Sequence, residues 1–201
     1  MSFLIDQWSM SDSSQHAVHD NIHQRQSIGH LIEPAPNANQ LEQAFQAALT
    51  APDHHRLKPT HFIVVEGAQR ESFGELMMGA VRDLGEKDEA QIERVRHHPM
   101  RAPILVLAVT RFQAHPKVPD FEQTLSSGAA VQNFLLSLQA QGFSTMWRSG
   151  AVVESKLLKL KLGLQEHDLI SGIIYVGTAF KAIPPRTEID TQPYVTYWHA
   201  N

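Results

Sequence analysis

The sequence contains no cysteine, and this absence excludes disulfides, thiolate metal sites and cysteine nucleophiles. It also has no apolar run of transmembrane length, because the longest run, around Ile104–Val109, is only as long as a strand. The polar, Ser-rich stretch Met1–His16 lacks the basic and apolar regions of a secretory signal. The lack of cysteine says little about compartment, so the missing signal and transmembrane segments make a cytoplasmic location the default expectation.

Common nucleotide-binding and hydrolase motifs are missing as well. No G-x-G-x-x-G follows a strand-like run, and G-x-x-x-x-G-K-[ST] and G-x-S-x-G do not occur. The Rossmann, P-loop and α/β-hydrolase interpretations therefore lose their main support. The net charge of −4 provides no overall field that would attract nucleic acid or an anionic membrane.

The composition that remains is that of one folded domain. The chain has 201 residues, of which 42% are hydrophobic and 19% charged, values that are ordinary for a globular protein with a sizeable core. There is no internal repeat, low-complexity tract or interdomain linker. We expect a flexible N-terminal segment over residues 1–15 and a single domain over residues 16–201.

The order of the predicted elements is most simply explained by a single α+β domain. Apolar residues at helical spacing, with capping residues and breakers, predict helices near 17–24, 37–49, 73–84, 86–96, 121–140 and 157–162. Buried strands are predicted at 61–66, 104–110 and 169–178, a short strand at 143–147 and a last strand at 194–198.

The longest predicted helix, Phe121–Ala140, is apolar on more than one face. Its small and large apolar residues are Gly128, Ala129, Ala130, Val131, Phe134, Leu135 and Leu138. A helix of this kind is buried in the core or against a partner. We expect a homodimer with this helix in the interface, with Ala130 in the seam, because a twofold partner covers the same patch with itself.

Two short polar segments are candidates for binding a phosphorylated ligand. Arg25-Gln26-Ser27 follows a predicted helix, and Arg148-Ser149-Gly150 follows a predicted strand. Each supplies a forked cation and a hydroxyl, the groups that suit a phosphate. Taken singly, each segment is equally typical of a solvated loop.

Histidine is abundant at 12 residues, which raises the alternative of a metal-binding protein. His19 and His23 have the i, i+4 spacing that places two rings on one helix face, and the pairs His54-His55 and His97-His98 also occur. No H-E-x-x-H motif accompanies them. Solvated or singly hydrogen-bonded histidines are the better interpretation, so we predict no metal.

Four stretches in register resemble the small, single-domain branch of the nitroreductase family. They are the R-x-S segment with A-P-D-H in RQSIGHLIEPAPNANQLEQAFQAALTAPDHHRLKPTHFIVVEG, the K-V-P-x-x-E-Q and W-R-S-G segments in HPKVPDFEQTLSSGAAVQNFLLSLQAQGFSTMWRSGAVVESKLLKLKLGL, and the strand IIYVGTAFK. No single motif is specific, but the resemblance runs from about Ile22 to Tyr197 with the elements in the same order. The resemblance implies a nitroreductase-like α+β fold with a central, mostly antiparallel sheet flanked by helices, a homodimer and noncovalent FMN.

The resemblance also implies which residues contact FMN. They are Arg25, Gln26, Ser27, His54, Trp147, Arg148 and Ser149, with Thr50, Gly150 and Lys181 as further candidates. Thr50 stands where this branch has Arg, which places one polar contact in doubt. The segment that aligns with a nicotinamide-nucleotide region comprises Ser137, Leu138, Gln139, Ala140, Gln141 and Gly142, although it equally fits the end of a buried helix.

The implied activity is an FMN-dependent oxidoreductase. NAD(P)H reduces flavin N5, and a nitroaromatic, quinone or similar acceptor then takes the electrons. A backbone N–H in the loop 147–150 is expected to face N5, and Arg148 to face O2 of the ring. No catalytic protein residue is needed, because the flavin carries the hydride. The alternatives are a flavin-binding protein of the same fold with poor NAD(P)H oxidation or another substrate transformation and, more remotely, a His-rich metal-binding protein.

Overall fold

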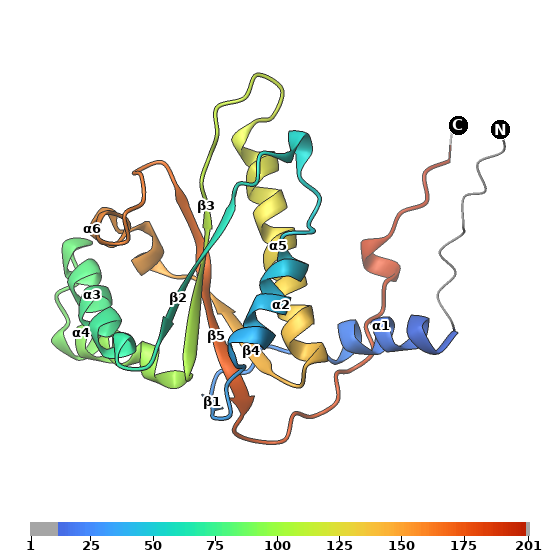
Figure 1. Cartoon of the computed structure of the whole chain (residues 1–201), viewed down its shortest axis with the longest axis horizontal. Helices are drawn as coiled ribbons and strands as arrows, with labels where there is room; N and C mark the ends of the chain where they lie inside the picture. The colour runs from blue at the N-terminus through green and yellow to red at the C-terminus, as the bar shows by residue number, and fades with distance from the viewer. Residues whose placement is uncertain (1–11, 200–201) are drawn as a thin grey trace.

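A computed structural model describes residues 12–199 of the chain. A central sheet lies between two layers of helices (Figure 1), with α2 and α5 on one face and α3, α4 and α6 on the other. The helices are α1 (Asp12–Gln24), α2 (Ala38–Ala48), α3 (Gln69–Asp83), α4 (Glu89–Arg96), α5 (Asp120–Ala140) and α6 (Lys156–Lys161). Short 3₁₀ turns are η1 (His54–Arg56), η2 (His98–Arg101), η3 (Ala151–Glu154) and η4 (Gln192–Tyr194).

The sheet is antiparallel throughout, which confirms the predicted α+β class. Its strands are β1 (Leu31–Ile32), β2 (Thr60–Glu66), β3 (Ile104–Thr110), β4 (Ser144–Arg148) and β5 (Leu169–Ala179). Their order is β1-β5-β3-β2, with β4 also paired to β5. Strand β5 is the longest and pairs with β1, β3 and β4, so it holds β4 in the sheet.

Strand β3 shows how the sequence builds two cores. All seven of its residues are buried, and successive side chains point to opposite faces of the sheet. Leu105, Leu107 and Val109 pack on the face covered by α3 and α6. Ile104, Val106 and Ala108 pack on the face covered by α2 and α5. The sequence of a strand that is buried on both faces is therefore a continuous run of apolar residues.

Helix α5 is buried by its own chain, and this corrects the predicted seam. Ala130, Phe134, Leu135 and Leu138 are at most 3% exposed and pack against α2 and the sheet. The neighbouring helix α2 covers the apolar face of α5 that the sequence pattern assigned to a partner chain. The pattern of α5 alone does not show this cover. The large apolar residues that α5 leaves exposed are Phe121 and Leu125 instead.

Two predicted strands differ from the structure. The first, at 61–66, is an edge strand and not a buried one, because β2 has β3 as its single neighbour and leaves Val64 exposed. The second, at 194–198, does not form: Gln192–Tyr194 is a 3₁₀ turn, and the following residues are exposed and pair with no strand of residues 12–199. The predicted charged helix begins at Glu89, three residues late, because the Asp88 carboxylate caps it.

The two ends of the described chain lie beside each other. Figure 1 shows α1 and the C-terminal segment extending from the same side of the body as α5. Asn21 holds α1 to α5 through a 3.0 Å hydrogen bond from Nδ2 to the Leu136 carbonyl oxygen. The predicted flexible segment 1–15 lies mostly outside the described residues. Across residues 12–199, no helix combines the length and the apolarity that a membrane crossing requires.

Candidate functional site

The structure brings the two predicted phosphate-binding segments together. Ser27 forms a parallel bridge with Thr145 in β4, and the Ile28 N–H donates to the Thr145 carbonyl oxygen at 2.9 Å. The chain from Arg25 to Ile28 therefore runs along the free edge of β4, and β4 leads directly into Trp147 and Arg148. Segments whose bridged residues lie 118 positions apart in sequence thus form one edge of the sheet.

Arg25 faces a second arginine that the sequence pattern did not single out. Arg186 Nη2 donates to the backbone carbonyl oxygen of Arg25 at 2.6 Å. Burial, and then the charge of Arg186, lower the pKa of Arg25. Neither guanidinium forms an ion pair within residues 12–199. Two cations held together without a carboxylate are suited to a dianion such as a phosphate monoester.

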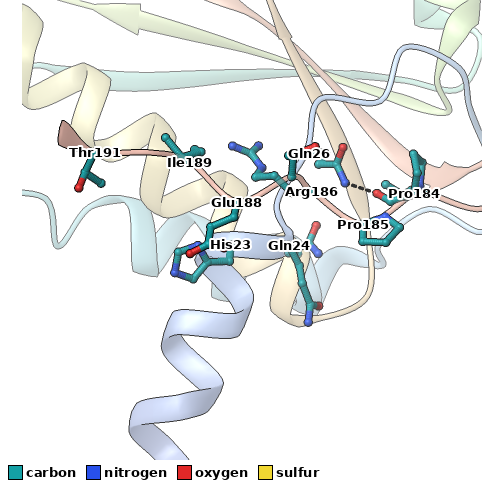
Figure 2. Close-up of a pocket in the computed structure, with 12 residues that line it drawn as sticks. His23, Gln24, Gln26, Pro184, Pro185, Arg186, Glu188, Ile189 and Thr191 are labelled. Atoms are coloured by element: carbon teal, nitrogen blue, oxygen red, sulfur yellow. Dashed lines mark hydrogen bonds between the residues drawn. The ribbon is translucent and has the colours of Figure 1, made fainter. Parts of the chain in front are cut away.

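A cavity of about 880 Å³ is lined by Arg186 and by Gln24 and Gln26, the two neighbours of Arg25 in sequence. The end of α1 and the segment 183–191 form its walls, and Figure 2 shows Arg186 and Glu188 on the segment facing His23 on the helix. Gln26 ties the two walls, because its Nε2 donates to the Pro184 carbonyl oxygen at 2.6 Å (Figure 2). The cavity is large enough for a nucleotide-sized ligand.

Trp147 is fixed at the end of β4 by a glycine in β5. Its indole Nε1 donates to the Ser171 carbonyl oxygen at 3.1 Å. A Cβ atom on Gly172 would lie 2.1 Å from that Nε1, so only glycine allows the ring to lie there. Opposite Gly172, the ladder between β3 and β5 shifts register at Ala108/Val109. The irregularity in β5 accordingly shapes the seat of Trp147.

The Arg148 side chain is held between a ring and a loop. Its Cζ lies 5.5 Å from the centroid of the Tyr175 ring, and a Cβ on Gly29 would lie 3.2 Å from its Nη2. Its Nε is buried and has no hydrogen-bond partner within residues 12–199. A buried guanidinium donor without an acceptor is costly, so this orphan donor indicates a ligand acceptor that the chain itself does not supply.

The loop after β4 leaves further donors free. Within residues 12–199, the backbone N–H groups of Ser149 and Gly150 donate no hydrogen bond, and both residues are exposed. Gly150 has φ of 154°, which side-chain-bearing residues rarely adopt. The predicted N–H donors are thus available next to the Arg148 Nε.

His54 belongs to a different part of the chain. Its Nδ1 lies 2.6 Å from Glu122 Oε2, in the first turn of α5. The loop around it is strained, because His55, Arg56 and Lys58 have positive φ. Asp53 supports this loop by accepting the backbone N–H groups of Leu57 and Lys58. Non-glycine residues in this conformation concentrate at functional sites.

An open groove of about 600 Å³ runs past His54 along α5. Its apolar wall includes Leu125, which is 66% exposed, and Phe121 beside it is 63% exposed. No hydrogen bond or ion pair of residues 12–199 connects His54 to the Arg25 and Arg148 group. Within one chain, therefore, the predicted site residues form two separate groups.

The remaining predicted residues take the following positions. The Thr50 hydroxyl donates to the Ala47 carbonyl oxygen at 2.7 Å and so closes the end of α2. Lys181 is exposed, and it is Arg186 that contacts Arg25. The segment 137–142 ends α5: Leu138 is fully buried, whereas Gln139 lines the cavity beside Arg186. The structure leaves the role of this segment as a prediction.

The histidines do not assemble into a metal centre. The rings of His54, His55 and His115 lie with successive centroids 4.8 and 4.5 Å apart and are tilted by 37° and 40°. No group of three or more His, Asp or Glu residues within 12–199 is placed to hold a metal ion. The geometry therefore gives the metal-binding alternative no support.

Comparison with known proteins identifies the family. The model of the nitroreductase family matches residues 22–178. The chain belongs to the nitroreductase family. This result agrees with the joined Arg25 and Trp147 segments, both of which lie inside the matched range.

Relatives in curated collections cover most of the chain. A protein of Escherichia coli K12 named "Putative NAD(P)H nitroreductase YdjA" is 39% identical over 175 residues, which are 87% of this chain and 95% of that protein. A Haemophilus influenzae protein named "Putative NAD(P)H nitroreductase" is 40% identical over 177 residues, 86% of this chain and 95% of its own length.

Solved structures show the same fold at low sequence identity. A nitroreductase-like family protein from Bacillus cereus superimposes with a TM-score of 0.79 at 18% identity, covering 91% of this chain and 96% of that one. A nitroreductase-family structure from Desulfovibrio desulfuricans, described as a complex with FMN, gives a TM-score of 0.70 at 18% identity and covers 96% and 100% of the two chains. At this identity the likeness establishes the fold.

Proposed function

We propose that this nitroreductase binds FMN noncovalently, with the phosphate held between Arg25 and Arg186. The observation that carries the proposal is the contact of two guanidinium-bearing residues that have no carboxylate partner. A phosphate dianion would neutralise both, and the nearby Ser27 would add a hydroxyl donor. The complex of a Desulfovibrio relative with FMN supports the choice of ligand.

The ring end of the flavin fits the loop after β4. The orphan Nε of Arg148 and the free N–H groups of Ser149 and Gly150 offer donors to a flat ligand with several acceptors. Trp147, fixed over Gly172, adds an aromatic face beside them. These donors are placed to stabilise negative charge that develops on the ring, so the residues present fit the cofactor.

We further propose a homodimer whose interface contains the groove beside His54. The exposed Phe121 and Leu125 give this face the large apolar side chains that interfaces favour. A twofold partner would bring His54 of one chain toward the Arg25 and Arg148 group of the other. This arrangement explains why the predicted flavin contacts form two groups within a single chain.

The proposed activity is electron transfer from NAD(P)H to a nitroaromatic, quinone or similar acceptor, and it agrees with the names of the curated relatives. The bound flavin supplies the hydride chemistry at N5. The chain contributes binding and electrostatics: Arg25 and Arg186 hold the phosphate, and Arg148 stabilises charge near O2. The unpaired N–H groups of Ser149 and Gly150 would donate to acceptors of the bound ring. No protein nucleophile is required.

Purified protein tests this proposal directly. We expect a yellow protein whose heat-released supernatant contains FMN, and bleaching of the flavin absorbance by NADH or NADPH under anaerobic conditions. Colourless protein that also fails to bind added FMN would refute the cofactor assignment. A yellow protein that neither nucleotide reduces would favour the alternative of a flavin-binding protein with poor NAD(P)H oxidation or another substrate transformation.

A further inference from the structure

A stripe of cations outside the phosphate site lies on α4 and η2. The backbone remains helical through the junction at His97, where φ is −85° and ψ is −5°. Arg94, His98 and Arg101 are consequently spaced i, i+4 and i+7 along one nearly continuous helical path, a spacing that places them on a common face. We refer to these three residues as the α4–η2 stripe.

The acidic residues of this region are engaged elsewhere. Glu75 and Glu93 both pair with Arg96, and Glu93 also accepts from His97. Within residues 12–199 neither Arg94 nor Arg101 forms an ion pair or a side-chain hydrogen bond. Arg96 of α4 is thus neutralised by carboxylates, whereas Arg94 and Arg101 of the stripe are not.

Arg148 joins the stripe from the sheet. Met146 and Arg148 alternate onto the same face of β4, and Met146 pairs with Tyr175 of β5. Tyr175 packs in the core layer beneath α3 and α6, and Arg148 lies 5.5 Å over its ring. The orphaned Arg148 Nε is therefore buried on the side of the sheet where α4 and η2 lie.

The charges of Arg101 and Arg148 influence the pKa values of both His98 and Tyr175. Burial, followed by the charges of Arg101, Arg148 and Arg94, lowers the pKa of His98 to about 4. Burial raises the pKa of Tyr175, and the charges of Arg148 and Arg101 oppose that rise. No carboxylate affects either group. The three guanidiniums that lower the pKa of His98, with no carboxylate among the causes, give this region a net positive potential.

We propose that Arg94, His98, Arg101 and Arg148 form an anion-binding site for the substrate of the reductase, which takes a carboxylate or phosphate group. Arginine forks match both groups, and the neutral imidazole supplies a further donor. Arg148 belongs to this site and to the loop proposed to face the flavin ring, so an anion held here would place the rest of a substrate beside that ring. This inference rests on the proposed flavin site.

The anionic group has two candidate sources, the electron acceptor and the dinucleotide. Calorimetry on FMN-loaded protein measures direct binding without turnover and distinguishes the two. The probes are 4-nitrobenzoate against the neutral 4-nitrobenzamide, and NADP⁺ against NAD⁺. We expect the acid to bind at least about tenfold more tightly than the amide if the acceptor carries the anion. Tighter binding of NADP⁺ than of NAD⁺ would show that the site takes the phosphate of the dinucleotide, which is the other anionic group that the proposal names. No preference within either pair would overturn it.

Substitutions test whether residues of the α4–η2 stripe cause the preference for the anionic probe. Arg101→Gln should reduce the measured ratio about tenfold, roughly the contribution of one charge-assisted contact, and Arg101→Lys should retain part of it. Arg82→Gln, a surface arginine of α3 paired with Glu89, is the matched control and should leave the ratio unchanged. An equal loss in Arg82→Gln would attribute the preference to general charge and contradict the site.

FMN affinity separates this inference from the proposed function. If Arg101→Gln weakens FMN itself as much as it weakens the acid, the stripe belongs to the flavin site and the proposal of a substrate site is wrong. If the protein binds no FMN, the acid and amide probes are applied to the protein as purified. If the protein still binds the acid, and Arg101→Gln weakens that binding, the anion site is supported although the proposed function has failed.

Discussion

Arg186 donates a 2.6 Å hydrogen bond to the backbone carbonyl of Arg25, although both side chains are cationic. The contact joins the C-terminal segment to the end of α1, 161 residues earlier in the chain. Because no carboxylate of residues 12–199 balances the pair, we regard it as a phosphate clamp that is complete only when the ligand is bound.

Replacing either arginine should weaken FMN and spare riboflavin. For Arg186→Gln or Arg25→Ala we expect a loss of roughly 1.5–3 kcal/mol in FMN binding, which is about one to two decades in affinity. Riboflavin lacks the phosphate, so its affinity should stay at the parent value. Quenching of flavin fluorescence measures both. An equal loss for the two ligands would show that the arginines support the fold instead.

Gly172→Ala should displace Trp147 from its seat. The new Cβ would lie 2.1 Å from the indole Nε1, and relieving such overlap costs about 1–3 kcal/mol of stability. We expect a lower melting temperature together with weaker FMN binding. Gly67→Ala is the control, since it also has positive φ but meets no atom within 4 Å. Unchanged flavin affinity in Gly172→Ala would mean that Trp147 does not shape the site.

Leu125→Glu should break the proposed dimer and release FMN. Leu125 is 66% exposed in the single chain, so the substitution places an unpaired charge in the interface and not in the core. Sedimentation with flavin fluorescence should show a folded monomer and at least about tenfold weaker FMN binding. Leu160→Glu, 72% exposed on α6, should remain dimeric. A monomer that keeps its FMN would exclude a site built from two chains.

Ala130→Glu, the variant that the sequence alone suggests for the seam, has a different expected result. Ala130 is 1% exposed and packs in the core between α5 and α2. A buried, unpaired carboxylate there should unfold the monomer. Circular dichroism would distinguish this outcome from clean dissociation, in which the helical signal is retained.

Acid should destabilise the protein through His98. Its pKa is lowered from 6.5 to about 4 in the folded chain, so the unfolded state binds a proton that the folded state does not. The free energy of unfolding should fall as the pH decreases from about 6.5 to about 4. Because the ring is partly exposed, we expect a loss on the order of 1 to 2 kcal/mol. Urea titrations of the parent and His98→Gln should show a shallower pH dependence in the variant.

The sequence by itself determined most of the helices and strands and the family, although it missed β1 and predicted a strand at 194–198 that does not form. The apolar run Ile104–Thr110 is a strand buried on both faces, and the periodicity of Asp120–Ala140 is that of a long helix. These patterns are local, because side-chain alternation and helical spacing are set by the geometry of one element. The R-x-S and W-R-S-G segments likewise indicated the family from the residues alone.

The tertiary structure decided which elements and residues meet. Helix α2 covers the apolar face of α5, which local periodicity could not distinguish from a partner's cover. Arg186 reaches Arg25, and Gly172 makes room for Trp147, through contacts between distant parts of the chain. Spacing along the sequence carries no record of such contacts, since they depend on the register of β4 and β5 and on the path of the C-terminal segment.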